Sequence, residues 1–232
     1  MFNLDGTVIL IGNKSNLMKI LEEQPSVHPE DETEIASTDI VNTPRVSNQN
    51  RSRIYTVAVL DGMAELQKMK KTPNMKTCHD LATEFCNKLD FILKKYDETH
   101  LVFDTYLENS LKNSMRRKRA GKTTPVKFKV TDNTNITNIS MRTFLSHSKT
   151  KDELTVYLAD KTIAFAQKMK RNLVVSWRNE AKASDGTDVT ALKSTHEEAD
   201  TKIILHCLYA SRHGATSLHI FSPDTDVFIL SI

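Results

Sequence analysis

From about residue 51, short β-prone apolar runs alternate with longer segments whose apolar residues have helical spacing. The unbroken run over residues 54–60 predicts a strand that is buried on both faces. Further strands are predicted over residues 100–103, 172–176 and 217–221. This alternation favours an α/β fold in which helices cover both faces of a mainly parallel sheet, a three-layer α/β/α arrangement.

The segments between these strands predict three amphipathic helices, over residues 78–96, 154–169 and 195–212. In the third helix, Thr195 and Glu198 have the spacing of a capping box, which places the helix start at these residues. Gly214 supplies its stop signal. The polar segment 178–194 before this helix is expected to be a loop.

The chain divides into three parts by composition. Residues 1–23 predict a short strand and a short helix. Residues 24–50 hold three of the six prolines and few apolar residues, so they predict a flexible linker. Residues 51–232 carry the alternating pattern and form the predicted core domain.

The charges are segregated, although the 32 Lys and Arg residues and the 29 Asp and Glu residues give a net charge of only +3. Eight basic residues and no acidic residue lie between Lys112 and Val130. Without these eight, 24 basic residues face 29 acidic ones in the rest of the chain. Such a segment favours a polyanionic partner, and a solvated helix face or a nuclear-localisation-like run is the alternative.

Carboxylates occur at the points where the predicted strands end and where the third helix starts. They are Asp61, Asp104, Asp224 and Asp226 at strand ends, with Glu197, Glu198 and Asp200 at the helix start. Because the carboxyl ends of parallel strands meet at one edge, we expect these side chains to converge. Crowded carboxylates repel one another unless cations neutralise them, and hard oxygen ligands suit Mg²⁺ or Mn²⁺. Two such ions about 3.5–4 Å apart can promote phosphodiester hydrolysis.

Each of these acids also has a purely structural explanation. Aspartate is a common N-cap after a strand, and glutamate near a helix start interacts favourably with the helix dipole. The sequence favours a metal site because so many carboxylates are predicted at the same edge.

The ordered motifs Val57–Met63, Leu101–Asp104, Glu198–Asp200 and Asp224–Asp226 resemble the nuclease core of the flap endonuclease/XPG group in the PIN-like superfamily. The longer stretches His196–Lys202 and Asp224–Leu230 also resemble uncharacterised, transposon-associated animal proteins with this core. The resemblance implies a PIN-like (5′-nuclease) fold with a basic, arch-like insertion at about residues 107–150. The family continues into a helix-hairpin-helix region, so we expect this chain to be truncated at its C-terminus.

The resemblance also implies roles for individual residues. One metal ion would be held by Asp61, Asp104, Glu198 and Asp200, and a second would be completed by Asp224 and Asp226. Glu197 could serve in place of Glu198. Contacts with nucleic acid are implied for Lys112, Arg116, Arg117, Lys118, Arg119 and Lys122. Two Mg²⁺ or Mn²⁺ ions are therefore the expected cofactors.

The residues and the resemblance together predict a metal-dependent nuclease, of a structure-specific kind, that hydrolyses phosphodiester bonds of DNA or RNA, with DNA the favoured partner. The alternative is a catalytically inactive PIN-like module, such as a domesticated element or a fragment, that binds nucleic acid or a protein.

The three cysteines indicate reduced thiols in a cytosolic or nuclear protein, and we expect a nuclear location. No apolar run reaches the roughly 18 residues of a membrane span, and Gly6–Ser15 lacks the Gly-Lys pair of a phosphate loop. Neither a membrane nor an organic cofactor is expected.

Overall fold

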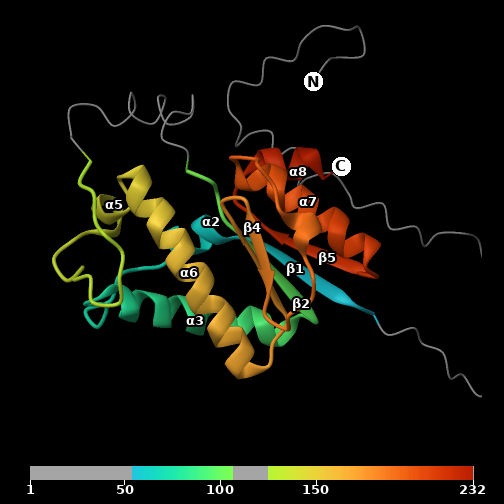
Figure 1. Cartoon of the computed structure of the whole chain (residues 1–232), viewed down its shortest axis with the longest axis horizontal. Helices are drawn as coiled ribbons and strands as arrows, with labels where there is room; N and C mark the ends of the chain where they lie inside the picture. The colour runs from blue at the N-terminus through green and yellow to red at the C-terminus, as the bar shows by residue number, and fades with distance from the viewer. Residues whose placement is uncertain (1–53, 107–124, 232) are drawn as a thin grey trace, which may run out of the picture. The chain divides into compact units, whose positions relative to one another are not determined.

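The computed structural model describes residues 54–106 and 125–231, which belong to one compact unit, Ile54–Ile232. A five-stranded sheet with the order β4-β3-β2-β1-β5 forms the centre of this unit (Figure 1). Its strands are β1 (Thr56–Asp61), β2 (Glu98–Val102), β3 (Leu173–Trp177), β4 (Glu180–Ala183) and β5 (Ser217–Phe221). Only β4 is antiparallel to its neighbour among these strands. The prediction of an α/β fold with a mainly parallel sheet is confirmed.

The helices of the described residues connect these strands. They are α2 (Gly62–Gln67), α3 (Cys78–Lys95), α5 (Met141–Phe144), α6 (Ser148–Met169), α7 (Ala199–Arg212) and α8 (Thr225–Leu230), with a short 3-10 turn, η1 (Thr190–Leu192). The structure confirms the predicted helices over residues 78–96 and 154–169. None of these helices has the length and apolar character needed to cross a membrane.

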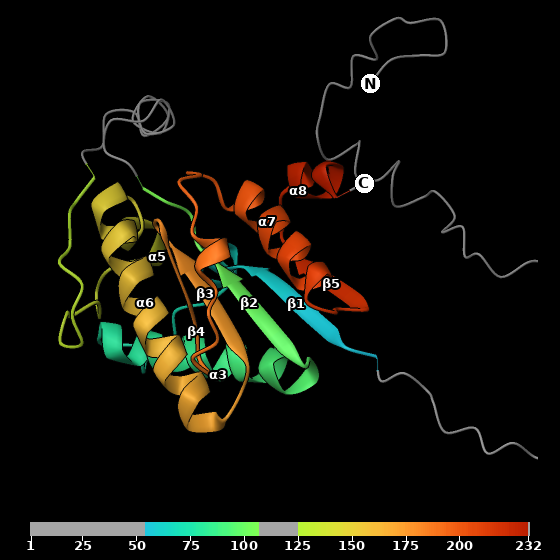
Figure 2. The same ribbon diagram turned by 45° about the vertical axis from the view of Figure 1, so that its right-hand side comes forward.

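Strand β1 is buried on both faces, as its unbroken apolar run predicts. Ala58 and Leu60 are fully buried in an apolar cluster that also holds residues of α3 and α6. Val57 and Val59 are fully buried in a second cluster with residues of α7 and α8. Figures 1 and 2 show α7 and α8 away from α3 and α6. Successive residues of a strand point to opposite faces, which explains this division.

The expected loop over residues 178–194 contains the short strand β4. Trp177 and Glu180 are paired, so Arg178 and the residue after it form a two-residue hairpin turn. Arg178 has a φ of 47°, in the left-handed region that favours glycine. The sequence pattern did not predict β4 because its turn lacks the usual glycine and because Ala183 is its only buried residue.

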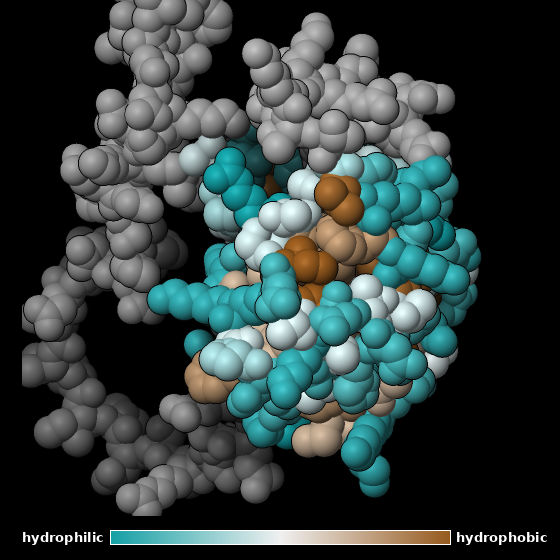
Figure 3. Space-filling view, turned by 90° about the vertical axis from the view of Figure 1, so that its left-hand side faces the viewer, coloured by the Kyte–Doolittle hydropathy of each residue, from teal (hydrophilic) through white to brown (hydrophobic). Residues whose placement is uncertain are grey.

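Residues 125–150 of the expected insertion pack against the α3 and α6 side of the core. Ile136 and Phe144 are buried in the same cluster as Leu60. On the surface that faces the viewer in Figure 3, hydrophilic side chains predominate around a small apolar area. The segments predicted at residues 1–23 and 24–50 lie outside the described residues, as do residues 107–124.

Candidate metal centre

The candidate site lies where the order of the sheet reverses. From β1 the chain continues to β2 and β3 on one side, whereas β5 lies on the other side of β1. In open parallel sheets, ligands bind beyond the carboxyl ends of the strands at such a reversal. Leu60 pairs with Phe221, so Asp61 and the loop after β5 leave the sheet at the same level.

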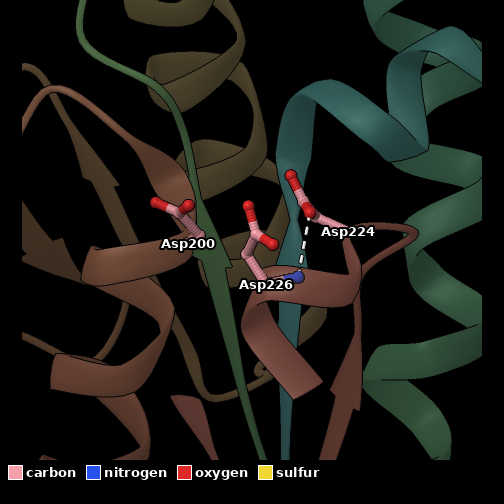
Figure 4. Close-up of side chains that lie close together, drawn as sticks. All are labelled: Asp200, Asp224 and Asp226. Atoms are coloured by element: carbon pink, nitrogen blue, oxygen red, sulfur yellow. Dashed lines mark hydrogen bonds between the residues drawn. The ribbon is translucent and has the colours of Figure 1, made fainter. Parts of the chain in front are cut away.

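Three predicted ligands converge at this point. Asp200 lies in the first turn of α7, Asp226 lies in the first turn of α8, and Asp224 precedes α8 (Figure 4). One carboxylate oxygen of each residue lies within 4.8 Å of the other two. Asp224 is exposed and the other two are half-buried, so water can reach the group. This acidic triad could hold a metal ion.

Asp61 lies at the carboxyl end of β1 but is not a member of the acidic triad. Its Oδ1 accepts a hydrogen bond from the Ala64 amide at 2.9 Å and so caps α2. Burial raises the pKa of Asp61, and repulsion by Asp104 raises it further, while its backbone hydrogen bonds oppose the change. The neighbouring strands therefore place Asp61 and Asp104 close enough to interact.

Asp104 caps a helix from another part of the chain. Its Oδ1 accepts a hydrogen bond from the Ala199 amide at 2.8 Å, and its Oδ2 accepts one from the Tyr106 hydroxyl at 3.3 Å. Helix α7 begins at Ala199, and its N-cap residue, Glu198, makes no capping hydrogen bond with its side chain. The predicted capping box at Thr195 is wrong because Asp104, which follows β2, supplies the cap.

The two candidate glutamates before α7 are not members of the acidic triad. Glu198 is exposed and Glu197 is half-buried, and the Glu197 carbonyl accepts a hydrogen bond from the Thr105 amide at 2.8 Å. This bond fixes the start of α7 to the segment that follows β2.

A carboxylate in this site can both cap a helix and belong to the acidic triad. Asp224 accepts a hydrogen bond from the Asp226 amide at 3.0 Å, in the manner of a cap for α8. Asp224 nevertheless belongs to the acidic triad. Asp61, Asp104 and Asp224 therefore all accept hydrogen bonds at helix starts, as the capping explanation predicts. Capping does not prevent a carboxylate from also binding a metal ion, as the position of Asp224 in the acidic triad illustrates.

The sequence did not point to Lys202, which lies beside the acids. Lys202 is on α7 and is 1% exposed. Its ammonium donates hydrogen bonds to the Arg178 carbonyl at 2.6 Å, the Thr105 hydroxyl at 2.8 Å and the Phe103 carbonyl at 3.4 Å. Burial lowers the pKa of Lys202 to about 8, and attraction to Asp104 opposes this change. The side chain thus remains mainly charged at neutral pH.

A second buried polar group was also missed. His206 follows Lys202 by four residues, on the same face of α7. Its two ring nitrogens contact Nδ1 of His100 at 2.8 Å and the Ser176 hydroxyl at 3.0 Å, and His100 in turn contacts Glu98. Burial, followed by repulsion from charge on His100 and Lys202, lowers the pKa of His206 well below its ordinary value. His206 is therefore neutral inside the protein.

The predicted nucleic-acid contacts lie outside the residues that the structure describes. They are Lys112, Arg116, Arg117, Lys118, Arg119 and Lys122.

No protein-family model matches the chain, and comparisons with curated proteins and with solved structures find no significant match. The assignment to a nuclease family therefore stays a prediction.

Proposed function

We propose that this chain is a divalent-metal-dependent nuclease that hydrolyses phosphodiester bonds. The observation that carries the proposal is the acidic triad of Asp200, Asp224 and Asp226, whose carboxylates converge at the reversal point of a parallel sheet. Parallel sheets bind ligands at this position, and hard carboxylate oxygens are the ligands that Mg²⁺ and Mn²⁺ prefer.

The donor set fits such an ion. Three carboxylates within 4.8 Å of one another, at a position that water can reach, match an ion that keeps several water ligands. Asp61 and Asp104 lie at the ends of the two adjacent strands, and we propose that they and Glu198 complete a site for a second ion.

The chain's own residues have separate tasks in this proposal. The acidic triad holds the cation, while Asp61 and Asp104 extend the negative site toward β2. A bound Mg²⁺ or Mn²⁺ supplies Lewis-acid chemistry and an activated water. The basic segment from Lys112 to Lys122 holds the phosphate backbone by its positive charge. DNA is the proposed partner and the nucleus the proposed location.

We also propose that the unit has the three-layer arrangement of the PIN-like fold. In support, alternate residues of β1 join one apolar cluster with α3 and α6 and another with α7. The order of the acidic positions along the chain gives further support, because Asp61, Asp104, Asp200, Asp224 and Asp226 follow the family's order.

A non-catalytic module that binds nucleic acid or a protein is the second candidate function. It is favoured by the hydrogen bonds of Asp61 and Asp104, which both serve helix starts in the described residues. These acids would be retained for folding even if no reaction took place.

A cleavage assay separates the two candidates. Flapped, single-stranded and duplex DNA, with RNA equivalents, are incubated with the protein and Mg²⁺ or Mn²⁺. We expect cleavage that is abolished by chelation and reduced at least about 100-fold in Asp224→Asn, the scale on which loss of one stabilising group slows a reaction. Asp160→Asn, the same change at an exposed position on α6, is the matched control and should cleave like the wild type.

Each other outcome has a definite meaning. A wild-type protein that binds these substrates without cleaving any of them in either metal supports the non-catalytic module. Cleavage that survives in Asp224→Asn places the reaction outside the acidic triad and contradicts the proposal.

A further inference from the structure

Lys202 joins three segments of the chain beneath the acidic site. Its three hydrogen-bond acceptors are Phe103 and Thr105, which flank Asp104, and Arg178 in the turn between β3 and β4. The Thr105 hydroxyl itself donates to the Arg178 carbonyl at 3.1 Å, so it accepts from Lys202. Three donated bonds require an ammonium group, because a neutral amine has only two hydrogens.

The acceptors of Lys202 are themselves held in place. Arg178 has the left-handed backbone conformation noted above, which is strained for a residue with a side chain. Its guanidinium donates hydrogen bonds to both carboxylate oxygens of Asp152 at 2.9 and 2.6 Å. This bidentate pair fixes the turn, so that the Arg178 carbonyl points at Lys202.

The same segments carry the acids. Lys202 follows Asp200 by two residues on α7, and two of its acceptors come from the residues on either side of Asp104. The Ala199 amide and Asp104 form a second link between these segments. Burying an ammonium group is costly, and a buried methionine of similar length would avoid that cost. The burial of Lys202 therefore indicates a role beyond filling space in the core.

We propose that Lys202 is a positioning residue of the metal site, which fixes Asp104, in the proposed site of the second ion, relative to Asp200 of the acidic triad. The inference rests on the proposed metal-dependent function. Ligands must be held within about 0.5 Å of their working positions by supporting hydrogen bonds. Lys202 supplies these bonds from inside the protein, and its charge reduces the repulsion among the carboxylates.

The test measures Mn²⁺ affinity rather than activity. Free Mn²⁺ is titrated by electron paramagnetic resonance with the wild type, Lys202→Met and Thr105→Val, each shown to be folded by circular dichroism. We expect Lys202→Met to bind Mn²⁺ at least tenfold more weakly than the wild type. Thr105→Val keeps the ammonium but loses one acceptor, and it should weaken binding about threefold. If Lys202→Met does not fold, Thr105→Val carries the test.

Two controls separate positioning from a loss of stability. Thr162→Val makes the same change at a fully buried threonine of α6, whose hydroxyl bonds to helix carbonyls. Leu158→Ala removes apolar contacts from the core on the α3 and α6 side. Both should keep the wild-type affinity for Mn²⁺, although Leu158→Ala is less stable.

Three results would overturn the inference. Unchanged affinity in both Lys202→Met and Thr105→Val would assign Lys202 a folding role alone. Tighter binding by Lys202→Met would show that Lys202 acts as a competing positive charge. Equal weakening in Leu158→Ala would show that any loss of stability disturbs the site. Absence of Mn²⁺ binding by the wild type is a different result, because it removes the proposed metal function itself.

Discussion

Gly62 lies directly against the aromatic ring of Phe103. A Cβ atom on Gly62 would be 2.5 Å from Cε1 of that ring, and Phe103 is fully buried. These residues follow β1 and β2, and each is next to an acid of the site, Asp61 or Asp104. The missing side chain at Gly62 therefore allows the two neighbouring carboxylates to approach each other.

Replacing Gly62 by alanine should disturb both folding and the site. The added methyl group would force the Phe103 ring or β2 to move, which typically costs about 1–3 kcal/mol. Because Asp104 adjoins Phe103, Mn²⁺ affinity should fall as well. Urea denaturation gives the first quantity and Mn²⁺ titration gives the second.

Gly186→Ala provides the control for this prediction. Gly186 has a φ of +84°, and beyond its own residue and its two chain neighbours no atom lies within 4 Å of the position of an added Cβ. This variant should lose about 1 kcal/mol of stability through backbone strain and keep its Mn²⁺ affinity. A Gly62→Ala protein as stable as the wild type would show that the contact with Phe103 is easily relaxed.

Asp61→Asn should stabilise the protein in the absence of metal. The raised pKa of Asp61 means that its negative charge destabilises the folded state above that pKa, chiefly through burial and also through repulsion by Asp104. Asparagine caps a helix as well as aspartate does. At pH 7 in the presence of a chelator, we expect the free energy of unfolding to rise by about 0.2–1 kcal/mol.

Asp61→Asn should also weaken Mn²⁺ binding if the Asp61 carboxylate contributes to the metal site. Asp160→Asn is the control and should alter neither quantity by a measurable amount. A less stable Asp61→Asn protein would mean that the carboxylate makes favourable contacts that outweigh its burial.

His206 should make stability depend on pH in a defined range. Its pKa is lowered in the folded state, so the unfolded chain takes up a proton below about pH 6.5 that the folded chain does not. The free energy of unfolding should therefore fall as the pH drops from about 6.5 to 5, by at most about 1.4 kcal/mol per pH unit from this residue.

The measurement compares urea denaturation of the wild type and His206→Gln across this range. The variant should show a shallower slope, whatever its absolute stability. His213→Gln changes an exposed histidine just after α7 and should keep the wild-type slope. Equal slopes for His206→Gln and the wild type would show that His206 takes up its proton in the folded state.

The apolar pattern within each segment was sufficient to predict the parallel strands of the sheet. Strands β1, β2, β3 and β5 were predicted from their short β-prone apolar runs. Most residues of β1, β2 and β3 are buried, whereas β5 at the edge of the sheet is half-buried to exposed. Strand β4 was missed because its pairing depends on a hairpin turn at Arg178 that carries no glycine signal. The start of α7 was misplaced because its cap, Asp104, is distant in the sequence.

Three of the seven candidate carboxylates lie close together in the structure. Asp200, Asp224 and Asp226 come together because strand ends and helix starts meet at one edge of a parallel sheet. Lys202 and His206 could not be found in the same way, since a charged residue on a helix is usually exposed. Their spacing of four residues, in phase with the buried Ala199, Ile203 and Ala210, was the available signal.

The most direct test of the metal centre is an anomalous difference map from a crystal soaked in Mn²⁺. We predict a peak within coordination distance of carboxylate oxygens of Asp200, Asp224 and Asp226. The peak should be lost in crystals of Asp226→Asn and kept in crystals of Asp160→Asn. A map without a peak at these three residues, from crystals that hold Mn²⁺ elsewhere on the protein, would contradict this prediction.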